Sequence, residues 1–516
     1  MIRYLLVAVS SFLFQSLSAQ SYYNVINYGA KNDSSVKCTK AIAAAIAAAS
    51  KKGGGTVYFP AGKYLTGPIH LKNNITVFID AGAEVSFSND FDDYMPFVES
   101  RFEGEDVMSF SPLFYAYKAE NISIVGRGKI NGNGKKWWDA ILNYKEGQPK
   151  TKWQVAAEAA NKNMIQPDDL GQLKSWILRP PFIQPMYCRN VLVQGITIVN
   201  SPFWTVNPEF CENVTVDGVT INNPHSPNTD GINPESCKYV HIANCHISVG
   251  DDCITIKSGK DKPGRLKAAP AENYTITNCT MLAGHGGVVI GSEMSGDVRK
   301  ITISNCVFDG TDRGIRIKTA RGRGGVVEEV RVSNIVMKNI KQQAVVLDMQ
   351  YTKTSPEPVS ERTPRFRNIH LSNITAQTAQ AIYINGIAEM PVEDVTFNDI
   401  QFDAQTGATI KEAKNIEFHN VRITTQQGPS ISAENVSDLT IEGVKTLNPI
   451  AGKPVIDLAN VQNVFLYNCN PVKGTETFLN VRGEKTKTVL LKNNNFVYAS
   501  KPLVKDSSVQ EDIKVE

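Results

Sequence analysis

A short strand-like unit recurs along almost the whole of this 516-residue chain. Each unit alternates apolar and polar β-formers and ends in a turn residue. Most steps between units are about 21 to 29 residues, a spacing typical of solenoids. Because a unit this short cannot bury its apolar face alone, the units must stack into one continuous core. Examples are Asn190-Val-Leu-Val-Gln-Gly-Ile, Lys300-Ile-Thr-Ile-Ser-Asn-Cys and Asn463-Val-Phe-Leu-Tyr-Asn-Cys.

Two classes of solenoid have repeats of this length, and the residue types favour one of them. A leucine-rich repeat needs Leu at fixed sites and usually a helix in each unit, and neither is seen here. Asn recurs instead in one turn slot, where its side chains can hydrogen-bond up the stack or simply suit a positive φ. The pattern therefore predicts an all-β parallel β-helix. The residues in this slot are Asn244, Asn278, Asn305, Asn334 and Asn373.

Nine cysteines are spread through the chain. Four of them follow an Asn in one slot of the repeat, where other units carry Ile or Val. A position shared by these residue types points inward, and a free Cys there behaves as a small hydrophobe. Since no CxxC pair or Cys/His cluster is present, we expect mostly buried thiols and no metal site. The four are Cys245, Cys279, Cys306 and Cys469.

Both ends of a solenoid core need a cover. The Ala-rich run 40–50, followed by three glycines, predicts a helix that covers the N-terminal end. We expect one β-helix domain over residues 20–505, interrupted at about 88–117 and 132–183, and a charged tail over 506–516. Tryptophans in the second interruption either stack on a ligand or pack the insertion, and packing is the ordinary outcome. They are Trp137, Trp138, Trp153 and Trp176.

The N-terminus has the features of a secretory signal peptide. Arg3 supplies a positive charge, residues 4–17 are mostly apolar, and small residues permit cleavage after Ala19. The apolar run is too short and too interrupted for a membrane span. We therefore expect residues 1–19 to be removed and the mature protein to be exported, either to the periplasm or out of the cell. The formal net charge of +3 gives no argument for nucleic acid or a membrane surface as a partner.

Three aspartates are spaced so that stacking brings them together. Asp230 and Asp251 are 21 residues apart, about one coil, so equivalent positions share a face on adjacent coils. Asp252 adds a third carboxylate. Carboxylates this close cannot all ionise freely, so at least one pKa should rise. A raised-pKa acid beside an ionised base is what cleavage of a glycosidic bond requires.

One histidine and two cations follow on the next coils. His285 lies between glycines, which leave room for a ligand, while Arg316 and Lys318 share the outward face of one strand. Two such cations can bind a carboxylate, Arg as a fork and Lys as a point charge. Each residue also has an ordinary alternative: the aspartates as turn residues, the histidine as a surface group, the cations as a solvated strand face. Chance is a poor explanation for all of them sharing one face of consecutive coils.

Taken together, four segments resemble the four motifs of the polygalacturonase family, glycoside hydrolase family 28. The resemblance extends from about Tyr23 to the last repeats, and residues 291–296 and 321–325 look like the bacterial, exo-polygalacturonase-like branch. It implies a single-stranded, right-handed parallel β-helix of the pectin lyase-like kind. It also implies an inverting hydrolase of α-1,4-galacturonosyl linkages in pectin. The segments are Asn228-Thr229-Asp230, Gly250-Asp251-Asp252, Gly284-His285-Gly286 and Arg316-Ile317-Lys318.

The resemblance assigns catalytic roles to four of these residues. Asp251 is expected to be the general acid that protonates the leaving oxygen. Asp230 and Asp252 are expected to hold and deprotonate the attacking water. His285 would tune or orient the acid.

The remaining residues are expected to bind substrate. Arg316 and Lys318 would hold the uronate carboxylate next to the scissile bond, Asn228 belongs to the same site, and Tyr351 resembles a family tyrosine that lines the cleft. The stretch 132–183 departs from short endo-acting members, so we expect it to wall off one end of the groove and make the enzyme exo-acting. No cofactor is expected, and a monomer is the default for a capped solenoid.

The sequence constrains the glycosidic linkage that is cleaved less than it constrains the type of reaction. The family includes enzymes that act on rhamnogalacturonan and xylogalacturonan, and these stay open as alternatives. A pectate lyase shares the fold but cleaves by β-elimination with Ca²⁺; the Gly-Asp-Asp and Arg-Ile-Lys combination favours hydrolysis, because lyases cluster carboxylates for calcium instead. A non-catalytic glycan-binding β-helix has no need for three carboxylates. We therefore predict a hydrolase whose partner is an acidic plant cell-wall polysaccharide.

Overall fold

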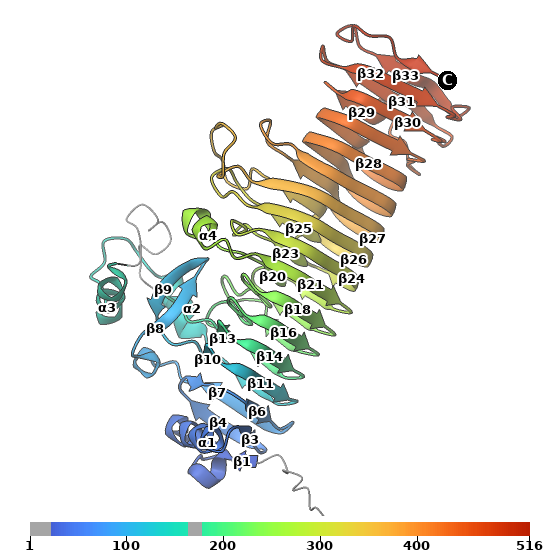
Figure 1. The fold of residues 1–516 in the computed structure, drawn as a ribbon. Helices are drawn as coiled ribbons and strands as arrows, with labels where there is room; N and C mark the ends of the chain where they lie inside the picture. Colours follow the sequence, from blue (N-terminus) through green and yellow to red (C-terminus); the bar gives the residue numbers. More distant parts are fainter. Residues whose placement is uncertain (1–21, 164–177) are drawn as a thin grey trace, which may run out of the picture.

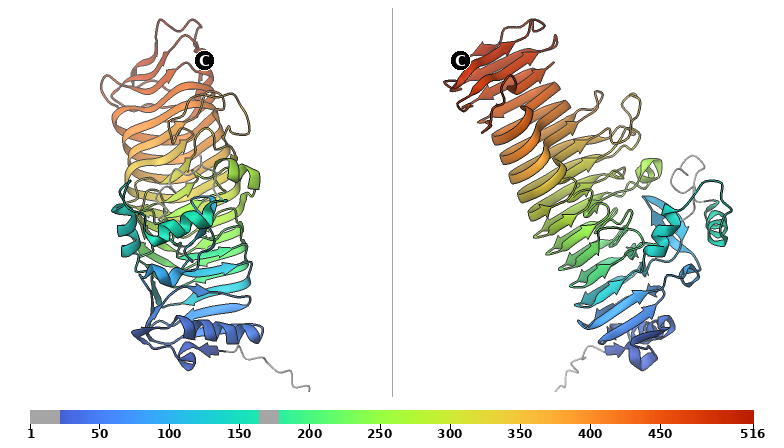
Figure 2. Two further views of the ribbon diagram at one scale, coloured as in Figure 1. Left: turned by 90° about the vertical axis from the view of Figure 1, so that its left-hand side faces the viewer. Right: turned by 180° about the vertical axis from the view of Figure 1, so that it is seen from behind.

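The computed structural model describes residues 22–163 and 178–516; the expected signal peptide, residues 1–19, and Trp176 lie outside the described residues. Strands stack in parallel along one axis into an elongated β-helix (Figures 1 and 2). The prediction of an all-β parallel β-helix is confirmed. Among the described residues, no helix is both long and apolar enough to cross a bilayer.

The strands of successive coils stack into three parallel faces. The first face contains β1 (Tyr22–Asn24), β3 (Gly55–Phe59), β6 (Ile75–Ile79), β11 (Glu120–Gly126), β14 (Arg189–Gln194), β16 (Glu212–Asp217), β18 (Lys238–Ala243) and β21 (Ala271–Thr277). The second contains β2 (Asp33–Lys37), β4 (Gly62–Thr66), β7 (Ala83–Phe87), β12 (Lys129–Asn131), β15 (Thr197–Val199), β17 (Thr220–Asn223), β19 (His246–Val249) and β22 (Thr280–Ala283). The third contains β5 (Ile69–His70), β10 (Phe114–Tyr117), β13 (Ile183–Met186), β20 (Ile254–Ile256), β23 (Val288–Ile290) and β25 (Ile315–Lys318).

Toward the C-terminus the strands run on around the corners of the coil. The long strands are β24 (Val298–Asp309), β26 (Val326–Asp348), β27 (Arg365–Asn385) and β28 (Val392–Glu442). The last coils are built from β29 (Pro454–Ala459), β30 (Gln462–Tyr467), β31 (Thr475–Arg482), β32 (Lys487–Lys492) and β33 (Ala499–Lys505). Within the expected tail, β34 (Lys514–Val515) pairs with β32, so the end of the chain lies on the last coil.

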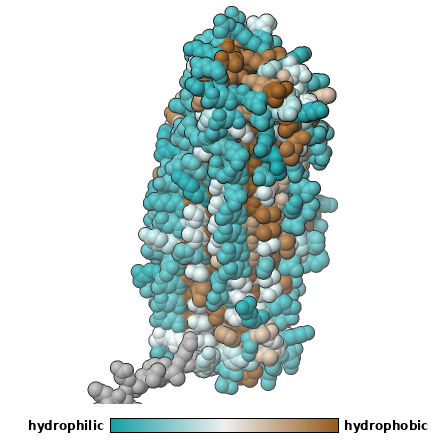
Figure 3. All heavy atoms as spheres, turned by 90° about the vertical axis from the view of Figure 1, so that its right-hand side faces the viewer, coloured by the Kyte–Doolittle hydropathy of each residue, from teal (hydrophilic) through white to brown (hydrophobic). Residues whose placement is uncertain are grey.

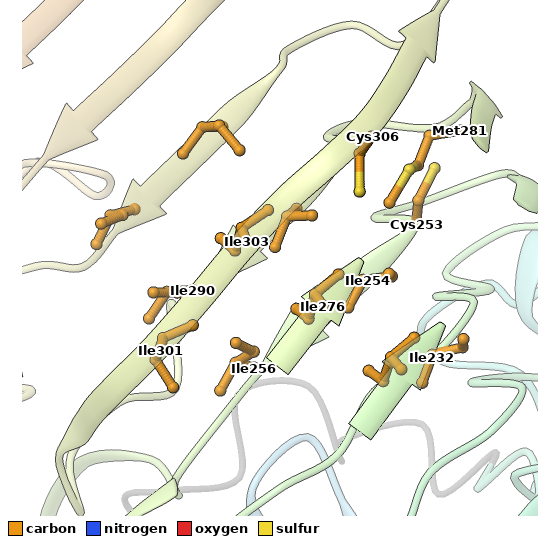
Figure 4. Close-up of a cluster of buried hydrophobic side chains, with 14 of the residues drawn as sticks. Ile232, Cys253, Ile254, Ile256, Ile276, Met281, Ile290, Ile301, Ile303 and Cys306 are labelled. Atoms are coloured by element: carbon orange, nitrogen blue, oxygen red, sulfur yellow. The ribbon is translucent and has the colours of Figure 1, made fainter. Parts of the chain in front are cut away.

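The core is a continuous column of inward apolar side chains. Ile254, Ile276 and Ile303 come from β20, β21 and β24 and point into the interior (Figure 4). Burying each such side chain stabilises the fold by roughly 1.5–3 kcal/mol. Cys253 and Cys306 lie among them, and all nine cysteines are buried and free, as the repeat slot predicts.

The recurring Asn residues both adopt a positive φ and hydrogen-bond along the stack, the two roles considered from the sequence. All five residues have φ between 50° and 58°, so each occupies a left-handed turn. Asn334 Nδ2 donates to Asn305 Oδ1 (3.0 Å), and Asn373 Nδ2 donates to Asn334 Oδ1 (2.8 Å). Asn244 donates instead to Asp217. The left-handed turn and the hydrogen-bonded ladder are therefore both present, and rows of residues of similar hydropathy run along the long axis (Figure 3).

Helices and a hairpin stand outside the coils. The predicted helix at 40–50 is confirmed as α1 (Thr39–Lys51), which buries Ile42 and Ile46 at the N-terminal end of the stack. The chain leaves the coils at η2 (Phe91–Tyr94), the antiparallel hairpin of β8 (Val98–Phe102) and β9 (Glu105–Ser109), α2 (Lys135–Leu142) and α3 (Lys152–Asn161). Two further short helices are η1 (Val25–Tyr28) and α4 (Asp261–Lys267).

The described tryptophans of the second interruption pack it together. Trp137 is fully buried and stacks on Phe91, with ring centroids 3.9 Å apart. Trp138 Nε1 donates to the Ser201 carbonyl (2.8 Å), and Trp153 Nε1 donates to a carboxylate oxygen on η2 (2.8 Å). Packing, the ordinary outcome, is confirmed for Trp137, and the indole hydrogen bonds of Trp138 and Trp153 tie those two residues to neighbouring segments.

Candidate active site

A cleft of about 700 Å³ lies at the third face of the β-helix. Every residue that the sequence singled out as a candidate site residue lines it, although the eight positions span residues 228 to 351. Stacking converts separations of one coil into neighbouring positions on one face, as the repeat predicts. The eight are Asn228, Asp230, Asp251, Asp252, His285, Arg316, Lys318 and Tyr351.

The strands and turns beneath the cleft explain how these side chains are held. In β25, Ile315 and Ile317 are buried in the core, which leaves Arg316 and Lys318 facing the cleft. Gly250, before the two aspartates, admits no side chain, because a Cβ there would lie 1.9 Å from the Ser226 carbonyl oxygen. Gly284 has φ +152°, and its Cβ would lie 2.5 Å from the backbone oxygen of the adjacent coil. Both glycines therefore permit the close turns that aim the site residues.

Asp251 and His285 form a pair at the open side of the cleft. His285 Nδ1 lies 3.1 Å from Asp251 Oδ1, and the Asp251 side chain is 19% exposed. Burial acts to raise the pKa of Asp251, but the hydrogen bond and charge of His285 outweigh it and lower that pKa. The same hydrogen bond raises the pKa of His285. The pair therefore keeps its shared proton to a higher pH than an isolated histidine would.

Asp252 faces the two cations of β25. Lys318 Nζ donates to Asp252 Oδ2 at 2.8 Å, and Arg316 Nη1 lies 3.9 Å from Oδ1. Oδ1 is buried and accepts no hydrogen bond from the described residues. The ring of Tyr351 stands beside both cations, 5.4 Å from the Arg316 guanidinium and 5.3 Å from Lys318 Nζ. One carboxylate oxygen and two cations are thus available to a ligand or a water molecule.

Asp230 is as deeply buried as Asp252. Its Oδ2 accepts hydrogen bonds from Asn233 Nδ2 (2.8 Å) and Thr255 Oγ1 (3.3 Å), and Lys257 Nζ lies 3.5 Å away. Burial, with repulsion from the two neighbouring aspartates, raises the pKa of Asp230 well above its ordinary value against the influence of Lys257. One carboxyl pKa is raised, as expected, although burial contributes more to the rise than the crowding of the aspartates. The raised group is Asp230 rather than Asp251.

The charges around the cleft suit an anionic ligand. Six carboxyl groups and six lysines or arginines line it, together with His285. The raised pKa of Asp230 favours its neutral form, and the raised pKa of His285 favours its protonated form. Within residues 22–163 and 178–516, no group of three or more His, Cys, Asp or Glu is arranged to hold a metal ion.

Comparison with known proteins places the chain in a family. The family model described as glycosyl hydrolases family 28 matches residues 168–425, which is half of the chain. The chain belongs to glycosyl hydrolase family 28. A second model, described as rhamnogalacturonase A/epimerase, pectate lyase-like, matches residues 22–135.

Relatives of this family 28 member include plant and bacterial proteins. A probable polygalacturonase of Vitis vinifera is 32% identical over 62% of this chain, and the match spans 61% of that relative, less than two thirds of its length. An endo-polygalacturonase of Pectobacterium carotovorum subsp. carotovorum is 30% identical over 67% of this chain and 79% of its own. The solved exopolygalacturonase of Thermotoga maritima has a TM-score of 0.71 at 33% identity, covering 79% of this chain and 92% of that one.

The family 28 cleft contains a buried lysine that sequence reasoning missed. Lys257 Nζ lies 3.1 Å from Glu293 Oε2, in addition to its contact with Asp230, and 3.9 Å from the centre of the Trp204 ring. Burial alone raises the pKa of Glu293, but Lys257 and Arg323 outweigh it and lower that pKa to about 2. A signal was present, because Ile-Thr-Ile-Lys257 repeats the pattern of Ile-Arg-Ile-Lys318 two coils earlier.

Asn228 is also held by a residue that the sequence did not indicate. Arg179 Nη2 donates to Asn228 Oδ1 at 2.8 Å, and its Nη1 donates to the Pro227 carbonyl at 2.7 Å. Burial lowers the pKa of Arg179 to about 10. Because Arg179 lies in an interruption of the repeat, periodicity gives no signal for it.

Proposed function

We propose that this family 28 member is an exported, exo-acting polygalacturonase. It hydrolyses α-1,4-galacturonosyl linkages with inversion and releases galacturonic acid from the ends of pectic chains. The observation that carries the proposal is the meeting of three carboxyl groups with Arg316 and Lys318 in one cleft. Paired carboxyl groups supply the acid and base of glycosidic cleavage, and the cations suit a uronate.

Asp251 is the general acid in this proposal. Two observations support this role: its carboxyl group is the most exposed of the three aspartates, and its Oδ1 contacts His285. Below the pKa of His285 the pair carries a proton. A bound uronate adds negative charge beside the pair, which raises the pKa of Asp251 and moves that proton toward the leaving oxygen.

Asp252, assisted by Asp230, activates the attacking water. The Asp252 Oδ1 atom is buried and accepts no hydrogen bond from the described residues, so it can accept one from water. Lys318 donates a charge-assisted hydrogen bond to the other carboxylate oxygen, Oδ2. Asp230 lines the same cleft, and its pKa is raised by burial and by the two neighbouring aspartates.

The exo mode and the location of the mature enzyme are part of the same proposal. The exopolygalacturonase of Thermotoga maritima aligns over 92% of its chain, which supports exo action, although the Pectobacterium relative is named an endo enzyme. Removal of residues 1–19 would leave a single β-helix domain over 20–505 with a short C-terminal segment at 506–516. We propose a monomer, since the stack is capped by α1 at its N-terminal end.

Purified mature protein should release galacturonic acid monomer from polygalacturonic acid in the presence of a chelator. Hydrolysis creates reducing ends, so reducing-sugar assay and product separation follow the reaction together. A ladder of oligomers would show endo action. An ultraviolet-absorbing unsaturated product that disappears with chelator would identify a lyase. If the protein released sugar from rhamnogalacturonan or xylogalacturonan but not from polygalacturonic acid, it would be a family 28 hydrolase of that other polysaccharide.

Arg316→Gln should lower kcat/KM on oligogalacturonates by about 10- to 100-fold, the value of one hydrogen bond to a charged group. The variant loses the fork that holds the uronate but leaves Lys318 in its contact with Asp252. Arg316→Lys is the matched control, because it keeps the positive charge without the forked guanidinium. Its kcat/KM should lie between those of the wild type and Arg316→Gln. Steady-state kinetics on trigalacturonic acid provide the measurement. Equal kcat/KM in all three proteins would remove Arg316 from substrate binding.

A further inference from the structure

The β8–β9 hairpin lies across the third face of the β-helix, beside the N-terminal coils of the cleft (Figure 1). Ser100 Oγ donates to Gln184 Oε1 of β13 at 2.7 Å, in a buried contact. The Phe102 ring stacks on Phe203, with centroids 4.7 Å apart and planes 7° from parallel. The face of the coils that precede Asp230 is therefore covered by the hairpin.

A buried arginine fixes the hairpin in place. Arg101 is 2% exposed, with Nη2 2.5 Å from Glu235 Oε1 and Nε 3.2 Å from Glu209 Oε2. Both glutamates are fully buried, so removing either partner would leave an unpaired buried charge. On the other side of the hairpin, Asn161 of α3 accepts from Met108 N (2.7 Å) and donates to Met108 O (2.8 Å). The hairpin is thus held from both sides.

The tip of the hairpin reaches the cleft. Glu103 lines the cleft, whereas no residue of 132–163 does. At Gly104, which has φ +86°, an added Cβ would meet Lys260 Cβ at 3.0 Å and Glu293 Cγ at 3.4 Å, so the tip closes against the cleft wall. The first interruption of the repeat, rather than the described part of the second, supplies the wall at this end. The second contributes by supporting β9 through α3.

The Glu103 carboxyl group is available to a ligand. It makes no hydrogen bond or ion pair with residues in the described ranges, although Lys260, Lys257 and Arg179 are near enough to influence it. Burial, followed by repulsion from Glu293, raises its pKa to about 7. When it is protonated it can both donate and accept hydrogen bonds, and it does not repel an acidic sugar.

We propose that the β8–β9 hairpin is the end stop of the cleft and that Glu103 receives the hydroxyl groups of the terminal uronic acid residue. This inference rests on the proposed function and deepens it, because it assigns the exo mode to one element and one specificity-determining side chain. A sugar chain that enters from the Tyr351 side meets Glu103 after it passes the aspartates. The chain cannot continue, because the hairpin occupies the face beyond.

Three variants test the assignment on trigalacturonic acid and polygalacturonic acid. Glu103→Ala should lower kcat/KM by about 10- to 100-fold, since it removes hydrogen bonds from a charged or acidic group. Glu103→Gln keeps a donor and an acceptor, so it should stay within about threefold of wild type at acid pH. Above about pH 7 it should lose less activity than wild type, whose Glu103 ionises there. Glu99→Gln, on the same hairpin but outside the cleft, is the matched control and should behave as wild type.

Replacing the tip residues 103–104 and their flanks by a shorter turn provides the second readout. The end stop predicts that oligomers then join the monomer among the products from polygalacturonic acid. Wild-type kinetics for Glu103→Ala together with monomer-only products from the shortened hairpin would overturn the inference and leave the proposed function intact. A wild-type enzyme that releases nothing, or that already gives an oligomer ladder, would overturn both.

Discussion

Replacing Asp251 with Asn should lower kcat on polygalacturonic acid by roughly 10²- to 10⁴-fold, the usual contribution of a positioned general acid. The substitution keeps the shape of the side chain and its reach toward His285 but removes the transferable proton. Because the carboxyl group is partly exposed and adds to the negative charge of the cluster, the folded state should be retained. Kinetics and the thermal unfolding midpoint, measured side by side, separate lost chemistry from lost structure.

The leaving group distinguishes an acid from any other essential carboxyl. A p-nitrophenyl α-galacturonide expels an acidic phenol that leaves without protonation, so Asp251→Asn should be far less impaired on this substrate. Asp230→Asn serves as the matched control and should be impaired on both substrates, because it supports the attacking water. If the rescue appeared in Asp230→Asn instead, the raised pKa of Asp230 would mark it as the acid. The roles of the two aspartates would then exchange.

The raised pKa of His285 predicts how the activity of the wild-type enzyme depends on pH. The pKa of His285 is raised by Asp251, so the pair holds its proton below that pKa and loses it above. Activity that depends on this proton should therefore decline as pH rises through the raised pKa of His285. His285→Asn should remove this limb of the pH profile while leaving binding of the substrate largely unchanged.

Periodicity was sufficient to predict the fold and to gather the candidate site. In a parallel β-helix, a separation of one coil along the chain becomes a contact between neighbours on one face. Asp230 and Asp251 could thus be placed together from spacing alone, and they line one cleft with Arg316. The inward direction of Ile315 and Ile317 followed from strand alternation in the same way.

The interruptions of the repeat were not predictable in the same way. Arg101 and Glu235 are 134 residues apart, and no periodicity links a hairpin outside the coils to the coil that it meets. The sequence directed attention to 132–183 as the wall of the groove, whereas Glu103 comes from 88–117. Burial also decides which carboxyl pKa rises, and burial depends on where such insertions dock. The set of candidate site residues could therefore be predicted from the sequence, but which of the three aspartates has the raised pKa could not.

Lys257→Met should lower the free energy of unfolding by about 3–5 kcal/mol near neutral pH, the usual cost of removing one partner of a buried ion pair. Lys257 is 6% exposed and is shared by Asp230 and Glu293. Methionine keeps most of the volume against Trp204 but leaves Glu293 as a buried charge with only the weaker influence of Arg323 and Lys318. Urea unfolding followed by tryptophan fluorescence, with exposed Lys40→Met as the control, measures the loss.

The pH dependence of that loss identifies its cause. The pKa of Glu293 is about 2 in the folded protein, below its ordinary value of 4.5, so its pairing stabilises the fold fully above pH 4.5 and less as pH falls toward 2. The gap between wild type and Lys257→Met should therefore be largest at neutral pH and close on acidification. Adding Glu293→Gln to Lys257→Met should recover part of the loss, because the unpaired charge is then gone. A gap that stays constant with pH, with no recovery in the double variant, would assign the loss to packing against Trp204 instead.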